Sequence, residues 1–125
     1  MRVNVDHPYT AEVAAMLLAT APLDFPMGDL EAQHSAGDVH FAVAESEGEA
    51  AAAVAWRVSG DLLEIIGLNA EGHALAIRAL WAALQERRRA DGLRAIMCMV
   101  EVRKMQMIVA RLGMSPRAVM YVEAA

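Results

Sequence analysis

The stretch between Asp61 and Met114 decides the fold, because four apolar segments follow one another there with short breaks between them. They read Asp61-Leu-Leu-Glu-Ile-Ile-Gly-Leu68, Leu75-Ala-Ile-Arg-Ala-Leu-Trp-Ala-Ala-Leu84, Leu93-Arg-Ala-Ile-Met-Cys-Met-Val100 and Ile108-Val-Ala-Arg-Leu-Gly-Met114. The first segment predicts a strand over Leu62 to Leu68, and the nearly continuous apolar run from Leu93 to Val100 predicts a strand covered on both faces. The second segment repeats apolar residues at helical spacing, which predicts a helix from about Glu71 to Ala90 that Asp91-Gly92 ends.

The rest of the chain adds helices and a hairpin around this block. Thr10 is a suitable cap for a helix from Ala11 to Thr20, and a short helix is expected from Asp29 to Ser35. The remaining expected elements are strands at Val39 to Glu45 and Ala50 to Val58 that pair as a hairpin, a helix at Lys104 to Arg111 ended by Gly113, and a last strand at Ala118 to Glu123. The order predicts one α/β (α+β) domain, residues 1–125, built on a mixed sheet.

Composition excludes several classes of protein. The formal net charge is −5 and the pI is about 5.3, so the chain lacks the excess of cations that binds nucleic acid. The run Arg87-Arg88-Arg89 falls at a predicted helix end, where it complements the helix dipole. No apolar run approaches 18 residues, and the N-terminus has no apolar signal core. Cys98 is the only cysteine, which fits a reducing compartment. We therefore expect a soluble, cytoplasmic protein with no membrane or nucleic-acid partner.

The four segments resemble the cofactor half of GNAT-type N-acetyltransferases. The segment Ile108 to Met114 lies where that family has a Leu-Tyr-x-x-Leu-Gly-Phe ending. The resemblance implies a GNAT-like mixed β-sheet flanked by helices. It also implies a loop of the type Arg/Gln-x-x-Gly-x-Gly/Ala after the central strand, whose backbone N–H groups hold the pyrophosphate of acetyl-CoA at a helix N-terminus.

The chain departs from the family pattern at the residues that serve chemistry. The loop aligns with Gly72-His-Ala-Leu-Ala-Ile77, which has Leu and Ile where glycines belong. We expect Asn69 to cap the following helix and Glu71 to lie in its first turn, so that the protein itself occupies the anion site. The family's Tyr, which protonates the leaving thiolate, corresponds to Val109, and its Asn corresponds to about Val102.

These departures favour a GNAT-fold protein that uses no cofactor and has lost acetyl-CoA catalysis. It would act as a binding, structural or regulatory subunit, self-associating into a homo-oligomer or binding a protein partner. By analogy alone, this class includes phage and assembly components.

The alternative is a divergent acyl-CoA-dependent N-acyltransferase. Its acetyl-CoA would be held by Leu68, Asn69, Gly72, His73 and Ala74, while Glu64 would be the general base. Tyr121 or a partner would supply the acid. The simpler interpretation makes Glu64 an outward-facing strand carboxylate and His73 a solvent-exposed loop residue.

We expect the other reactive side chains to have structural roles. His7, His34 and His40 have no metal-ligand spacing with one another or with Cys98, so no metal site is expected. Cys98 lies between two methionines and is expected to be a buried small hydrophobe. A third, weaker function is ligand binding in an apolar groove for a peptide, lipid or partner, built from the methionines of the last third of the chain: Met97, Met99, Met105, Met107, Met114 and Met120.

Overall fold

The computed structural model describes residues 1–19, 29–70, 73–98, 106–107 and 110–114. Its centre is one five-stranded sheet in the order β1-β2-β3-β4-β5. The strands are β1 (Arg2–His7), β2 (His40–Ser46), β3 (Glu49–Ser59), β4 (Leu62–Asn69) and β5 (Ala95–Cys98). Neighbours from β1 to β4 are antiparallel, while β4 and β5 are parallel. The predicted mixed sheet is confirmed.

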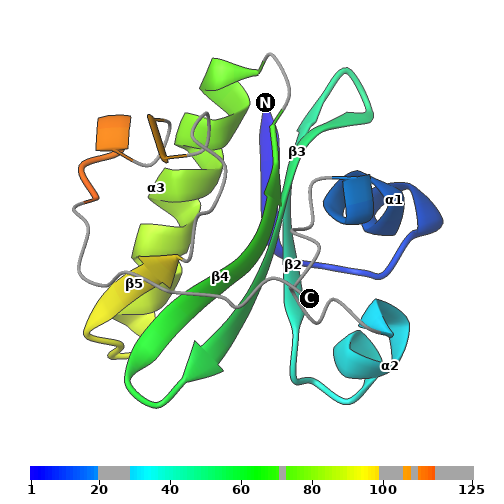
Figure 1. Ribbon diagram of the computed structural model, residues 1–125. Coiled ribbons are helices and arrows are strands. Elements are labelled where there is room, and N and C mark those ends of the chain that lie inside the picture. The colour runs from blue at the N-terminus through cyan, green and yellow to red at the C-terminus, as the bar shows by residue number, and fades with distance from the viewer. Residues whose placement is uncertain (20–28, 71–72, 99–105, 108–109, 115–125) are drawn as a thin grey trace, which may run out of the picture.

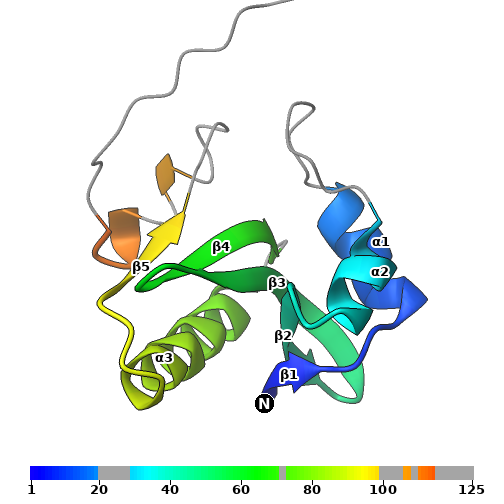
Figure 2. The ribbon, with the colours of Figure 1, turned by 90° about the horizontal axis from the view of Figure 1, so that it is seen from below.

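Helices cover both faces of this sheet. Figures 1 and 2 show α1 (Ala11–Ala19) and α2 (Leu30–Ser35) on one face and α3 (Ala74–Ala90) on the other. Each face has its own apolar cluster. Leu80 and Leu84 of α3 pack over Trp56 and Leu63, whereas Val13 and Leu17 of α1 pack with residues that include Phe41 and Ile66. The α/β architecture expected from the sequence, a mixed sheet flanked by helices, is confirmed.

The β2–β3 hairpin forms although four consecutive alanines in β3 favour a helix on intrinsic propensity. Its turn consists of Glu47 and Gly48, which both have positive φ angles, 54° and 79°, as a two-residue hairpin turn requires. Ala52 packs in the cluster under α3 and Ala53 in the cluster under α1, and neither is exposed. Small side chains at these positions let helices approach both faces of β3, so packing overrides propensity.

Local caps agree with the sequence for the first two helices. The hydroxyl of Thr10 accepts a hydrogen bond from the N–H of Val13 at 3.2 Å, as expected for the α1 cap. Asp29 caps α2 by accepting from the N–H of Ala32 at 3.0 Å. At the other end of the chain, residues 106–107 and 110–111 are helical and Gly113 has φ +89°, which supports the predicted helix end.

Two expectations about strands need correction. The sequence analysis predicts no element at the N-terminus, yet Arg2–His7 forms edge strand β1, with Val3 and Val5 packed against the cluster under α3. The predicted strand from Leu93 is described only from Ala95 to Cys98, and it is exposed to half-buried rather than covered on both faces. Among the described residues its only strand neighbour is β4. The expected strand at Ala118 to Glu123 lies outside the described residues.

Candidate active site

The strands β4 and β5 pair over only part of the length of β4. Their parallel ladder runs from Leu62 opposite Ala95 to Ile65 opposite Cys98, and β4 then continues to Asn69. Beyond Ile65, the described part of the chain gives β4 a partner on the β3 side alone. The last described pair of the two strands therefore lies near the middle of β4.

A β-bulge lies in β4 at the same point. Trp56 of β3 pairs with Ile65 and Ala55 pairs with Gly67, so Ile66 is an additional residue on β4. The side chain of Ile66 packs with α1 and α2, while Ile65 and Leu68 face α3. A bulge interrupts the ladder and turns backbone groups away from it, and bulges are frequent beside active sites.

Helix α3 begins later than the sequence analysis expects, and its N-cap residue His73 supplies no side-chain cap. The helix starts at Ala74 rather than Glu71, with His73 as N-cap, and the side chain of His73 makes no capping hydrogen bond. The first turn contains no acidic residue. Glu71 and Gly72 lie outside the described residues. The expectation that a carboxylate occupies the first turn of this helix is therefore wrong.

Asn69 is not the N-cap residue of α3, since that residue is His73. The amide Nδ2 of Asn69 donates to the carbonyl of Met16 at 2.8 Å, on the opposite face of the sheet from α3. Met16 lies in the last turn of α1, where carbonyls have no partner within the helix. Asn69 is 8% exposed, so this bond ties the end of β4 to α1 in a buried position.

Glu64 is buried and paired, which corrects the interpretation of it as an outward-facing carboxylate. It is 5% exposed, and its two oxygens accept from Nε and Nη2 of Arg57 at 2.9 and 3.3 Å. This hydrogen bonding raises the pKa of Arg57, whose side chain is 46% exposed. Sequence reasoning missed Arg57, although the tight turn after Ser59 places Arg57 opposite Glu64 in the β3–β4 hairpin.

Cys98 is half-buried at the last described pair of β4 and β5. Burial, with a smaller contribution from the negative charge of Glu64, raises the pKa of its thiol to about 11. The thiol is therefore protonated at neutral pH, which agrees with the expectation that Cys98 is no nucleophile.

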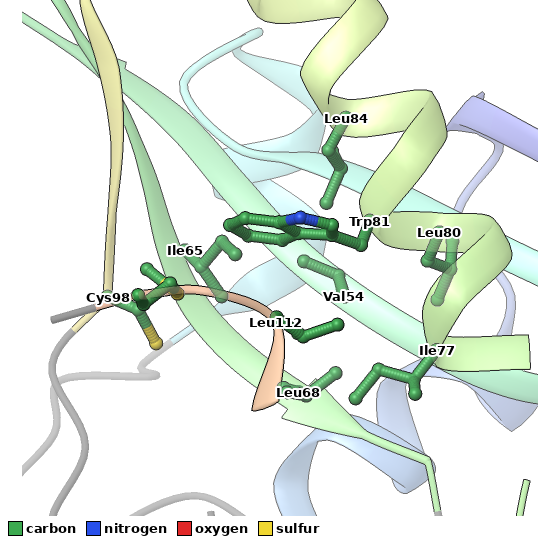
Figure 3. Close-up of a pocket in the computed structure, with 10 residues that line it drawn as sticks. Val54, Ile65, Leu68, Ile77, Leu80, Trp81, Leu84, Cys98 and Leu112 are labelled. Atoms are coloured by element: carbon green, nitrogen blue, oxygen red, sulfur yellow. The ribbon is translucent and has the colours of Figure 1, made fainter. Parts of the chain in front are cut away.

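An apolar cavity lies between α3 and the sheet beside this pair (Figure 3). Its volume, about 20 Å³ for a water-sized sphere, is small. The lining residues are Val54, Ile65, Leu68, Ile77, Leu80, Trp81, Leu84, Cys98, Leu112 and Met114. Met114 is the one methionine among these residues. Met99, Met105 and Met120 of the expected methionine groove lie outside the described residues, so that groove stays a prediction. Six of the ten lining residues belong to α3 and β4.

The remaining candidate residues are placed as follows. Leu68 is 9% exposed and lines the cavity, while His73 and Ala74 are exposed at the start of α3. Tyr121, Val102 and Val109 lie outside the described residues. Within the described ranges, no group of three His, Cys, Asp or Glu side chains is arranged to hold a metal ion. His7 and His40 instead lie near the carboxylates of Glu45 and Asp6, at 3.4 and 3.6 Å.

The arginine run Arg87-Arg88-Arg89 lies in the last turn of α3. Arg87 contacts the carboxylates of Asp6 and Asp91, and Arg88 donates to the carbonyl of Leu93 at 3.0 Å. These two guanidinium groups thus form contacts at the C-terminal end of α3, where the sequence predicts a structural role for them. In the part of the chain that the structure describes, no helix is long and apolar enough to cross a membrane.

Solved structures with the same fold are acetyltransferases. A Bacillus subtilis acetyltransferase in complex with CoA is 14% identical, with a TM-score of 0.69 over 90% of this chain and 74% of its own. Aminoglycoside N-acetyltransferase AAC(6′)-Iy in complex with the bisubstrate analogue CoA-S-monomethyl-acetylneamine is 15% identical, with a TM-score of 0.68 over 100% of both chains. A probable acetyltransferase is 13% identical, with a TM-score of 0.70 over 100% of this chain and 97% of its own.

The comparisons identify the fold as GNAT-like. No protein-family model matches the sequence, and no curated protein matches it significantly. The leading interpretation from the sequence, a subunit without acetyl-CoA catalysis and without a cofactor, is contradicted, because the structural neighbours are acetyltransferases and several are CoA complexes. These neighbours favour the alternative, an acyl-CoA-dependent N-acyltransferase.

Proposed function

We propose that this protein is an acyl-CoA-dependent N-acyltransferase. One observation carries this function. The central strand β4 leads within a few residues to the start of the 17-residue helix α3, whose N-cap residue His73 makes no capping hydrogen bond. The same fold is seen in acetyltransferases solved with CoA. A bound CoA would lie along the end of β4, with its phosphates at the start of α3.

The residues present fit a CoA diphosphate. The backbone N–H groups of Leu75 and Ala76 belong to the first turn of a 17-residue helix, where they have no carbonyl partner within the helix. The positive end of the helix dipole attracts anions, and no carboxylate competes in the first turn. His73 is exposed beside these groups and adds a positive charge when protonated. Backbone donors thus replace the glycine-rich loop of the family pattern.

The acyl-transfer chemistry needs little from the side chains of this chain. The thioester of acyl-CoA supplies an activated acyl group, and holding it near an amine provides much of the rate. Glu64 is the candidate group for removing a proton from the acceptor amine, and Arg57 fixes the orientation of its carboxylate. Tyr121 stays a prediction for the acid. We also place this activity in the cytoplasm, which the single cysteine supports, and self-association stays a prediction.

Binding of CoA tests this function with a variant that has opposite effects on folding and binding. Leu75 is 75% exposed in the first turn of α3, so Leu75→Glu should stabilise the helix by about 0.3–1 kcal/mol through the dipole. The same carboxylate should repel the diphosphate and weaken CoA binding by roughly five- to tenfold. Calorimetric titration and thermal unfolding measure the two effects on one protein.

The matched control is Ala82→Glu, an exposed position on the same helix. It lies about 10 Å further along the axis, about one Debye length away at moderate salt, so it should change CoA affinity by less than about twofold. Wild-type protein in CoA at a hundred times its dissociation constant should gain about 2.7 kcal/mol of stability. The function is refuted if the wild type shows no binding at millimolar CoA, and the role of α3 is refuted if both variants bind equally.

A further inference from the structure

The cavity lies beside Ile65 and Cys98, a pair of residues in the β4–β5 ladder. Ile65 and Cys98 are the last described pair of that ladder, and both line the cavity, as does Leu68 further along β4. Figure 3 shows these side chains on one side, those of α3 on the other and Leu112 between them. A CoA thioester lying along the end of β4 would therefore bring its acyl carbons to this cavity.

The cavity is closed at its base and more open at its rim. Val54, Leu80 and Leu84 form the base and are at most 2% exposed. The rim consists of half-buried side chains: Trp81, Cys98, Leu112 and Met114. An acyl chain would therefore enter past this half-buried rim rather than through the buried base.

The chemistry of the wall selects an alkyl group. The lining side chains present carbon and sulfur, apart from the indole nitrogen of Trp81 at the rim. A water molecule needs two to four polar partners, which such a wall does not supply. Acetyl brings only one methyl group, whereas a volume of about 20 Å³ accommodates about one or two further methylene groups.

We propose that this site prefers a short aliphatic acyl group, propionyl or butyryl, over acetyl on the CoA thioester. The proposal rests on the acyl-CoA function above and adds the class of acyl donor. Each buried methylene should improve affinity roughly fourfold as far as butyryl. Hexanoyl-CoA should bind more weakly than butyryl-CoA because the base of the cavity, formed by Leu84 and Val54, stops a longer chain.

Equilibrium binding measures this preference without an acceptor amine. Calorimetric titration would give dissociation constants for CoA and for acetyl-, propionyl-, butyryl- and hexanoyl-CoA with the wild type. Cys98→Leu fills the rim of the cavity and should remove the advantage of butyryl over acetyl. Leu112→Ala enlarges the cavity and should move the best chain length towards hexanoyl. Val58→Leu adds one methylene at a position that is 49% exposed and outside the cavity, so it should keep the wild-type order.

Each possible result either supports or refutes the proposed acyl preference. Rising affinity from acetyl to butyryl, lost in Cys98→Leu and kept in Val58→Leu, supports the proposal. If wild-type affinity is equal or falls from acetyl to butyryl while CoA itself binds, the acyl preference is refuted and the proposed function stands. If neither cavity variant changes the order, the cavity is refuted as the acyl site, with Leu112→Ala deciding alone where Cys98→Leu does not fold. If CoA itself does not bind, the proposed function fails and this inference fails with it.

Discussion

Removing Arg57 should destabilise the fold through Glu64, whose carboxylate depends on it. Glu64 is 5% exposed and both its oxygens bond to the guanidinium, so Arg57→Met leaves a buried carboxylate without its partner. Breaking a fully buried pair costs about 3–5 kcal/mol. Here the Arg57 side chain is 46% exposed, and water screens the pair from that side. We therefore expect a loss of about 2 kcal/mol in the free energy of unfolding, and methionine keeps most of the apolar stem in place.

A double-mutant cycle separates the pair from the packing around it. Arg57→Met with Glu64→Leu should recover to within about 1 kcal/mol of the wild type, because no unpaired charge stays buried. Urea unfolding followed by the fluorescence of Trp56 and Trp81 gives all the free energies, provided that the transition is two-state. The reasoning is refuted if the free energy of unfolding of Arg57→Met differs from that of the wild type by less than ~0.3 kcal/mol, the precision with which such values add. It is also refuted if the double variant is less stable than either single variant.

Two further predictions concern Asn69 and Cys98. Asn69→Ala should lower the free energy of unfolding by about 1–2 kcal/mol, because the buried carbonyl of Met16 loses its donor. Amide hydrogen exchange should become faster at the end of α1, and unchanged exchange there would contradict this role. Burial raises the pKa of Cys98 from 9.0 to about 11, so iodoacetamide should react roughly a hundredfold more slowly at pH 8 with the folded protein than with the urea-unfolded protein. The folded state holds this proton more tightly. Its contribution of about 3 kcal/mol is therefore fully present below pH 9 and lost between pH 9 and about 11, and a Cys98→Ala variant should not show that loss.

Regular elements with strong local patterns could be predicted from the sequence. The apolar spacing of Ile77, Leu80 and Leu84 and the stop at Asp91-Gly92 predict α3 to its observed last residue. The hairpin of β2 and β3 follows from alternation and from Gly48 in the turn. Strand β1 also carries an alternating pattern, Arg2-Val-Asn-Val, but it is short and polar on alternate positions, so its placement depends on pairing with β2.

The candidate site depends on contacts between residues far apart in the chain, and these contacts mislead local reasoning. Asn69 has the residue type and position of a helix cap, yet a carbonyl of α1, 53 residues earlier, takes its amide. Glu64 alternates as a surface residue would, yet Arg57 across the hairpin pairs with it in a buried position. The cavity needs β3, β4, α3, β5 and Leu112 at once, so no single segment of sequence indicates it.

The position of Asn69 explains how an anion site can persist without the glycine motif. A cap on α3 would satisfy the first-turn N–H groups within the protein and lower their attraction for phosphate. The amide Nδ2 of Asn69 bonds to the carbonyl of Met16 in α1 and so stabilises the end of β4. The cost of leaving the start of a helix uncapped, about 1 kcal/mol, is then met by the packing of Ile77, Leu80 and Leu84 against the sheet. On the proposed function, the backbone N–H groups in the first turn of α3 would bind the CoA diphosphate and be stabilised by it.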